Sequence, residues 1–301
     1  MRLTAADGCA LGACLYRPRA EAPAQRVALV HGGAGIPARY YRRLARFLAR
    51  EGIPVLLYDY RGIGASRPPT LRGFRAQVED WAEYDCSAAI AWLRARYPTA
   101  ELIGIAHSVG ALLFGGAENA GEQARLVLVG AHTGYYGDYR RLYRLPMALL
   151  WHGVMPALTR LVGYFPARRL GLGDDLPAGV ALQWASRRRA EVRSAAGADE
   201  RTERLLARCA SLARPALVLR FSDDAFATAA GTRRLLGYYP RLAPQHVEWR
   251  PETLGVRRIG HFGFFGRRVG ALAWPWLSEW LRAPHGAVAV VRAAPLEARP
   301  A

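Results

Sequence analysis

The chain has 301 residues and a formal net charge of +18, and 51% of its residues are hydrophobic. This hydrophobic fraction excludes a wholly disordered or collagen-like chain and predicts a globular protein with a large core. The sequence contains no lysine, so arginine carries all of the positive side-chain charge. A lysine Schiff base and a lysine-dependent phosphate loop are therefore excluded.

The first part of the chain alternates short apolar runs with amphipathic segments. Two expected strands joined near Asp7 and Gly8 are followed by a strand at 27–30, which ends in a glycine-rich loop at 31–35. Continuous apolar runs that stop at glycines are typical of strands buried on both faces. The same pattern predicts strands at 53–58, 102–105 and 126–129, and helices at 38–50, 78–97 and 108–117.

The alternation stops at 138–205, where segments rich in Pro, Trp, Tyr and Arg predict an inserted helical lid. It resumes with a strand at 216–221, a helix at 228–238, a strand at 246–250 and a helix at 269–281. This order predicts an α/β fold with a mostly parallel central sheet flanked by helices and an antiparallel N-terminal edge. We expect a core formed by 1–137 and 206–285, the lid at 138–205, and a loose tail at 286–301.

The isoelectric point near 10.6 raises the question of a polyanionic partner. The arginines are spread along the chain without a compact basic and aromatic motif, which argues against nucleic-acid binding. Their densest groups, at 140–144, 168–169 and 187–189, all lie in the predicted lid. Prolines, a histidine and an arginine interrupt the apolar region 145–165, which predicts a pair of buried or pocket-lining helices and no transmembrane segment. The N-terminus lacks the apolar core of a signal peptide, which predicts a cytoplasmic protein.

Ser108 lies in the most informative motif of the chain. It falls between a predicted buried strand and a predicted helix, with Ala106 two positions before it and Gly110 two positions after it. A serine on so tight a turn needs very small neighbours at these positions, because its strained backbone lies against adjacent chain. The motif predicts a nucleophilic serine; a plain serine at a helix N-cap is the alternative interpretation.

A serine hydroxyl is a poor nucleophile without a base, so a histidine is required. His261 follows the last predicted strand in a loop flanked by glycines, from which an imidazole can reach the serine. His132 follows a strand end and is expected to line the pocket. His107 adjoins the serine but is expected to point elsewhere, and His31 is expected to have a structural role.

An acid must orient the imidazole and stabilise its charged form. Asp223 and Asp224 both follow the strand at 216–221, and Asp138 is a more distant candidate. An oxyanion also needs backbone N–H donors. Val109 is expected to supply one, and Gly33 or Ala34 the other.

The order Ser108, Asp224, His261 resembles that of the α/β-hydrolase superfamily. Residues 58–66 (YDYRGIGAS) are similar to a structural turn of the lid-bearing members of this superfamily. Those members also resemble this chain in a Phe-x-Asp-Asp segment, here residues 221–224, whose second aspartate is the acid. That resemblance favours Asp224 over Asp223. The segment 260–265 (GHFGFF) looks like the histidine loop of a bacterial branch near the serine aminopeptidase-like hydrolases.

The resemblance implies a serine hydrolase that cleaves a carboxylic ester or related acyl bond through an acyl-enzyme, with Ser108, Asp224 and His261 as triad and Val109 and Gly33 as oxyanion donors. Neither a metal nor an organic cofactor is expected. The expected partner is a small acyl substrate, which the lid arginines would bind if it is anionic. Expected substrate-binding residues are Ala34, His132, Trp151 and Trp184.

The lid leaves two interpretations open. Its apolar residues form an acyl pocket, or they only pack the lid onto the core. The fold also hosts other functions. One alternative is an acyltransferase or thioesterase acting on a phosphate-bearing acyl carrier, and another is a non-catalytic protein that binds an apolar ligand. The sequence specifies neither the substrate nor the oligomeric state.

Overall fold

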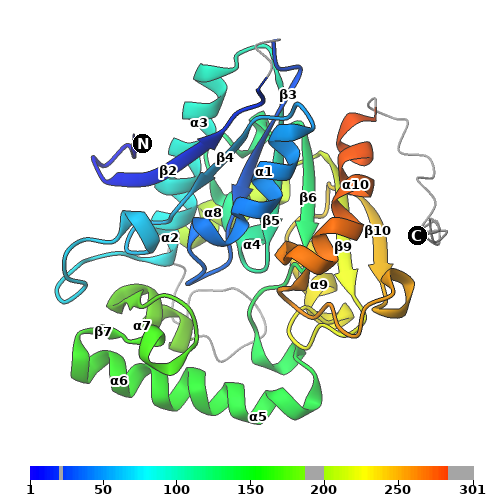
Figure 1. Cartoon of the computed structure of the whole chain (residues 1–301). Helices are drawn as coiled ribbons and strands as arrows, with labels where there is room; N and C mark the ends of the chain where they lie inside the picture. The colour runs from blue at the N-terminus through cyan, green and yellow to red at the C-terminus, as the bar shows by residue number, and fades with distance from the viewer. Residues whose placement is uncertain (20–22, 187–199, 284–301) are drawn as a thin grey trace.

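The computed structural model describes residues 1–19, 23–186 and 200–283. Eight strands form one sheet in the order β1-β2-β4-β3-β5-β6-β9-β10 (Figure 1). Neighbours from β4 to β10 pair in parallel, whereas β2 pairs antiparallel with both β1 and β4. The predicted sheet and its antiparallel N-terminal edge are confirmed. The strands are β1 (Arg2–Thr4), β2 (Ala10–Tyr16), β3 (Arg26–His31), β4 (Val55–Tyr58), β5 (Glu101–His107), β6 (Arg125–Val129), β9 (Pro215–Phe221) and β10 (Ala243–Trp249).

Side chains along the central strands alternate between two hydrophobic clusters. In β3, Val27 and Leu29 belong to one cluster, and Ala28 and Val30 belong to the other. Successive side chains of a strand point to opposite faces, so both faces of this sheet are buried. This burial explains why the strands read as continuous apolar runs.

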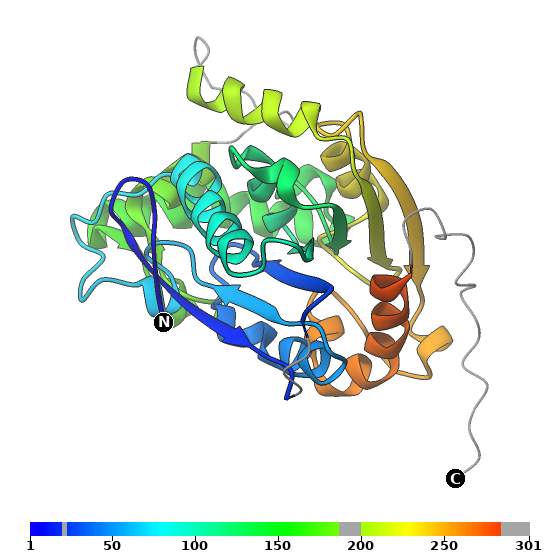
Figure 2. The same cartoon turned by 90° about the horizontal axis from the view of Figure 1, so that it is seen from above.

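Helices cover both faces of the sheet (Figure 2). Residues of α1 and α10 pack in one cluster, while residues of α3, α8 and α9 pack in the other. The expected helix at 78–97 contains a π turn at Trp81–Cys86, and the one at 108–117 is a short α4 followed by a 3₁₀ turn. The helices of this core are α1 (Arg42–Arg50), α2 (Val78–Asp80), α3 (Ser87–Arg96), α4 (Gly110–Leu113), α8 (Glu200–Ser211), α9 (Ala229–Leu236) and α10 (Arg267–Arg282).

Residues 139–186 form a helical insertion between β6 and β9. It contains α5 (Arg141–Leu149), α6 (Met155–Val162), the short strands β7 (Tyr164–Phe165) and β8 (Leu176–Pro177), and α7 (Ala178–Ser186). Figure 1 shows it below the carboxyl ends of the parallel strands. In place of the expected pair of helices at 145–165, one continuous helix runs over Arg141–Val162. A π turn at 150–154 joins α5 to α6, and Pro156 lies in the first turn of α6, where a proline is tolerated.

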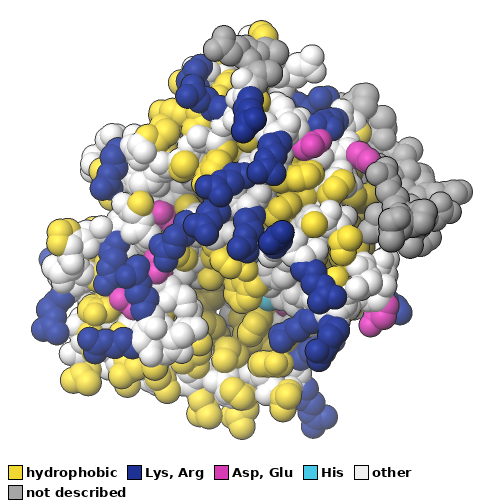
Figure 3. Space-filling model, viewed as in Figure 1, with side chains coloured by type: hydrophobic (Ala, Val, Ile, Leu, Met, Phe, Trp, Pro, Cys, Tyr) yellow, Lys and Arg dark blue, Asp and Glu magenta, His cyan; other side chains and the backbone are white. Residues whose placement is uncertain are grey.

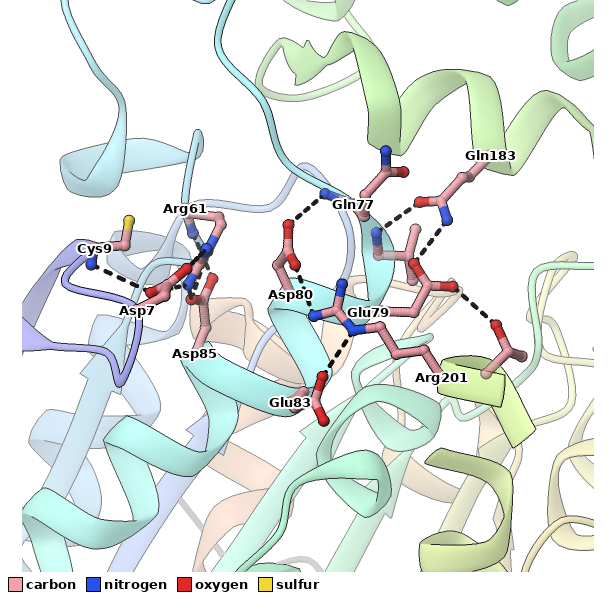
Figure 4. A network of polar contacts seen from close by, with 12 residues as sticks. Asp7, Cys9, Arg61, Gln77, Glu79, Asp80, Glu83, Asp85, Gln183 and Arg201 are labelled. Carbon is pink, nitrogen blue, oxygen red and sulfur yellow. Dashed lines mark hydrogen bonds and ion pairs between the residues drawn. The ribbon is translucent and has the colours of Figure 1, made fainter. Parts of the chain in front are cut away.

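Polar contacts fasten the insertion to the core (Figure 4). The Gln183 amide of α7 donates to Glu79 at 2.7 Å and accepts the N–H of Val78 at 2.8 Å. Next to it, Arg201 of α8 binds both Asp80 and Glu83 at 2.7 Å. These contacts fix α7 and α8 on the segment that begins at α2.

The predicted boundaries of the lid, 138 and 205, remain a prediction. Residue 205 lies inside α8, whose Leu205 and Cys209 pack in the core cluster. The arginines at 187–189 and the predicted tail at 286–301 lie outside the described residues.

Candidate active site

Ser108 lies directly after β5 on a strained turn. Its φ of +57° makes it the only non-glycine residue with positive φ in the described part of the chain. The turn brings the neighbouring chain so close that a Cβ on Gly110 would lie 2.6 Å from the carbonyl oxygen of His31. This contact explains the need for glycine at position 110. A residue held in a strained conformation by its surroundings is typical of functional sites.

Three side chains form a continuous chain of hydrogen bonds at the carboxyl ends of the strands. The hydroxyl oxygen of Ser108 lies 3.0 Å from Nε2 of His261, and Nδ1 of His261 lies 2.8 Å from Oδ2 of Asp224. Ser108, His261 and Asp224 are 8%, 7% and 2% exposed. Because the ionised carboxylate only accepts, the His261 proton resides on Nδ1, and Nε2 is left as an acceptor for the serine hydroxyl.

The two adjacent aspartates have different partners. Oδ1 of Asp224 accepts the N–H groups of Phe226 and Ala227 at 2.8 and 2.9 Å, while its Oδ2 faces His261. Burial acts to raise the pKa of Asp224, but the hydrogen bonds from His261 and from these N–H groups hold the pKa below its ordinary value. Asp223 instead accepts the N–H groups of Ile259 and Gly260 at 2.9 Å, so it anchors the loop that carries His261.

Asp138, the third acid considered, lies away from this chain of hydrogen bonds. Its carboxylate binds the guanidinium of Arg234, with the closest atoms 2.6 Å apart. Among the described residues, no three His, Cys, Asp or Glu side chains form a group that could hold a metal ion.

His132 is closer to the serine than the sequence suggests. Its Nε2 lies 3.0 Å from the Ser108 hydroxyl oxygen, and its Nδ1 accepts the N–H of Gly134 at 2.9 Å. The proton of the neutral ring must then reside on Nε2, which donates to the serine oxygen. The two histidines thus play opposite parts: His261 accepts from the hydroxyl and His132 donates to it.

The two expected oxyanion donors of the glycine-rich loop, Gly33 and Ala34, differ in their hydrogen bonds. Among the described residues, the N–H of Ala34 has no acceptor, whereas the N–H of Gly33 has one. That acceptor is the hydroxyl of Tyr41, at 2.8 Å. The N–H of Val109 likewise makes no hydrogen bond to any residue that the structure describes. The glycine-rich loop lies against the serine, since a Cβ on Gly33 would be 3.3 Å from Ser108 Cβ. The N–H groups of Ala34 and Val109 are therefore the ones left without an acceptor beside the serine in the described part of the chain.

A second series of hydrogen bonds, through Tyr41 and His107, reaches the backbone of the histidine loop. The Tyr41 hydroxyl lies 3.0 Å from Nδ1 of His107, whose Nε2 lies 3.1 Å from the carbonyl oxygen of His261. Burial holds the pKa of His107 well below its ordinary value, so this ring stays neutral. Both ring nitrogens of His107 thus bond groups other than the serine. The part played by Tyr41 was not anticipated, because nothing in its local sequence marks it.

A cavity of about 880 Å³ lies over Ser108, between the core and the insertion. Its lining includes all four expected substrate-binding residues, Ala34, His132, Trp151 and Trp184. Arg39, Arg42 and Arg43 line it from the side of α1. Figure 3 shows this hollow between arginines above and hydrophobic side chains below, with a histidine visible inside it.

Known proteins show the same fold. A monoacylglycerol lipase from Paleococcus ferrophilus superposes with a TM-score of 0.55 at 16% identity, over 90% of this chain and 98% of that one. The esterase RhEst1 from Rhodococcus sp. ECU1013 gives a TM-score of 0.57 at 16% identity, over 93% and 98% of the two chains. The quorum-quenching protein AidA of Acinetobacter baumannii is 34% identical over 84 residues, which is 27% of this chain and only 26% of AidA.

Family membership follows from the sequence itself. The family described as "Serine aminopeptidase, S33" matches residues 21–241, which is most of the chain. The match includes the serine turn and confirms the resemblance to this family, whereas the histidine loop at 260–265 lies beyond the matched residues. The protein thus belongs to the serine aminopeptidase S33 family of α/β hydrolases.

Proposed function

We propose that this protein is a serine esterase in which Ser108, His261 and Asp224 form a catalytic triad. The hydrogen-bonded chain from Asp224 through His261 to Ser108 carries the proposal, because nucleophile, base and orienting acid lie within hydrogen-bond distance in the required order. Structural neighbours that are named as esterases and a lipase agree with this reaction class.

Acylation begins when Nε2 of His261 takes the proton of Ser108 as the serine oxygen bonds to the ester carbonyl carbon. The carbonyl oxygen becomes an oxyanion, for which the N–H groups of Val109 and Ala34 are the donors. His261 then returns the proton to the alkoxide leaving group, which departs as an alcohol. Asp224 stabilises the imidazolium between these two transfers.

Deacylation repeats these steps with water. His261 takes a proton from water, the resulting hydroxide adds to the acyl carbon, and the proton returns to the serine oxygen as the acid leaves. The Nε2–H of His132 donates to the serine oxygen while that oxygen is losing its proton. We assign His132 a positioning role, in which it aims the hydroxyl proton at His261.

The cavity supports an apolar acyl group. Trp151 and Trp184 lie with their ring centroids 5.8 Å apart and line the cavity from the insertion. Met147 and Leu150 add further apolar lining from the same side. A concave and mainly apolar surface that also carries polar groups is what an acyl ester requires. The insertion acts as the lid of this site in our proposal.

The test is hydrolysis of p-nitrophenyl esters by the wild type and by Ser108→Ala. We expect wild-type turnover and a loss of at least about 10³-fold in the variant, because the residual rate comes only from binding and the oxyanion donors. Circular dichroism shows whether the variant is folded. Near-wild-type activity in folded Ser108→Ala would overturn the proposal.

A second candidate function rests on the arginines of the cavity. Arg39, Arg42 and Arg43 line one side of it, where they could bind the phosphates of an acyl carrier such as coenzyme A. Thioester hydrolysis or acyl transfer would then be the main reaction. A kcat/KM for acyl-coenzyme A above that for the matched oxygen ester would favour it, and the reverse order would favour the esterase.

A further inference from the structure

Large hydrophobic side chains are exposed mainly on one segment of the molecule. Of the ten described residues of this kind, seven lie within 142–172. Leu142, Leu145, Leu149 and Leu161 are 81%, 68%, 60% and 79% exposed. Soluble proteins expose such side chains singly, and a contiguous group marks an interaction surface. We call Leu142, Leu145, Leu149, Val154 and Leu161 the leucine row.

The leucine row follows the outer side of one long helix. This helix, Arg141–Val162, has 22 residues and a mean hydropathy of 1.2 in its most apolar window, of which 11% is buried. By length and composition it could cross a membrane. Its inner side, however, lines the cavity with Met147, Leu150, Trp151 and Met155. A helix that packs on its own protein along one side and is apolar along the other is suited to lie in the plane of a membrane surface.

The charge around the leucine row has one sign. Between residues 139 and 173 the sequence contains six arginines and neither Asp nor Glu. Arg141 and Arg144 are exposed at the start of the helix, and Arg160 is exposed near its end. In Figure 3, hydrophobic side chains gather over this helix at the lower edge, with arginines beside them. Apolar side chains flanked by arginines match a bilayer with anionic headgroups.

A second cavity, of about 660 Å³, opens beside the start of this helix. Four arginines line it: Arg140 from the insertion, and Arg257, Arg258 and Arg268 from the core. We call these four residues the arginine pocket. The carboxylate in its lining, Asp223, is already bonded to two backbone N–H groups of the histidine loop. The composition of this pocket suits a phosphate group.

Charge also distinguishes two possible partners of the leucine row, a second copy of this chain and an anionic bilayer. A symmetric dimer through this row would set the arginines of one copy against those of the other, with no carboxylate from the same segment to pair with them. An anionic bilayer offers apolar chains and negative phosphates together. Leu172 and Phe262 are exposed and also line the first cavity, so apolar surface continues to the cavity mouth.

We propose that the leucine row and the arginine pocket form a peripheral binding surface for anionic phospholipid membranes. The leucine side chains insert between the acyl chains, and the arginine pocket binds headgroup phosphates. The helix lies in the plane of the bilayer surface and does not cross it.

The experiment is co-sedimentation of the full-length protein with vesicles of phosphatidylcholine, alone or mixed with phosphatidylglycerol. We expect binding to the mixed vesicles that weakens with added salt and is much weaker with phosphatidylcholine alone. Leu145→Ser/Leu149→Ser should lower the affinity at least about tenfold, because two apolar side chains no longer leave water. Leu145→Met/Leu149→Met, which keeps both positions apolar, should bind like the wild type.

The arginine pocket is tested with a matched change of charge. Arg257→Gln/Arg258→Gln should lower the affinity for phosphatidylglycerol vesicles severalfold. Arg50→Gln/Arg241→Gln removes the same charge at the opposite end of the strands and should have little effect, because only arginines next to the bilayer bind it. Ser108→Ala should bind as the wild type does, so the result is independent of the proposed catalytic role.

Three results would overturn the proposal. They are no binding of the wild type to phosphatidylglycerol vesicles, equal binding by the Leu→Ser variant, and equal losses in the two arginine pairs. A wild-type dimer in light scattering that Leu145→Ser/Leu149→Ser abolishes, together with no vesicle binding, would assign the leucine row to a second copy of this chain.

Discussion

The turn at Ser108 and the helical insertion meet at one cavity but are built in different ways. Around the serine, the polar side chains are buried and held by short hydrogen bonds to backbone and to one another. In the insertion, the long helix leaves its leucines in solvent, and polar contacts such as those of Gln183 tie α7 to the core. The reacting groups are thus fixed by the backbone of the core, whereas the insertion contributes surfaces. We expect substitutions in the first region to affect the rate and those in the second to affect what is bound.

The largest difference should come from the two adjacent aspartates. Asp224→Asn should lower kcat roughly 10³- to 10⁴-fold, because an amide N–H facing His261 favours the wrong tautomer of the ring. Asp223→Asn should lower it less than about tenfold, since the amide oxygen still accepts one of the two loop N–H groups. Ester hydrolysis by the two variants measures this ratio, and equal losses would contradict the assignment of Asp224 as the acid.

A buried histidine of the core, His31, should make the free energy of unfolding depend on pH. His31 is fully buried between Tyr58 and Gln123, and burial lowers its pKa from 6.5 to about 4. Below pH 6.5, His31 binds a proton in the unfolded chain but stays neutral in the folded chain down to about pH 4. The free energy of unfolding therefore falls as the pH drops from 6.5 to 4, by about 3 kcal/mol in total.

Urea unfolding of the wild type and of His31→Asn between pH 7 and pH 5 checks this dependence. The variant should lose less stability over that range than the wild type. His246→Asn, which changes an exposed histidine on the edge strand β10, is the control and should follow the wild type. Parallel curves for the wild type and His31→Asn would show that His31 titrates normally in the folded protein.

A smaller effect is expected at His132. His132→Ala should lower kcat about 10- to 100-fold, the range for one hydrogen bond to an oxygen that becomes charged. KM should change little, because the bond is to the serine and not to the substrate. His132→Gln keeps an N–H donor of similar reach and should recover part of the rate. A change in KM alone would make His132 a substrate-binding residue, as the sequence first suggested.

The smallest effect should come from the insertion. Trp151→Ala should lower kcat/KM for long-chain esters about tenfold and leave acetate esters unchanged, because only a long acyl group reaches that part of the cavity. Trp276→Ala removes another half-buried tryptophan outside the cavity and serves as the control. Equal losses for short and long esters would indicate that Trp151 only packs the insertion onto the core.

The sequence predicted the serine turn because backbone geometry dictates its residues. Gly110 is required by the carbonyl groups of the neighbouring loop, so the spacing of small residues around Ser108 is itself the signal. The sheet was predictable for a similar reason, since burial on both faces demands continuous apolar runs. The choice of Asp224 came from resemblance, and the structure shows that Asp224 faces the ring of His261, whereas Asp223 accepts backbone N–H groups of the same loop.

Contacts between distant residues were not predictable. The N–H of Gly33 donates to the hydroxyl of Tyr41. No local sequence pattern predicts that the side chain of Tyr41, the residue just before α1, reaches the glycine-rich loop. The long helix was missed because Pro146 and Pro156 were taken as breaks, whereas a π turn lets the helix continue between them.

The central claim, that Ser108 is an activated nucleophile, is tested most directly by intact-mass analysis after incubation with a fluorophosphonate, which phosphonylates activated serines. We predict one adduct on the wild type and none on folded Ser108→Ala. No adduct on the folded wild type, or the same adduct on both proteins, would contradict the account.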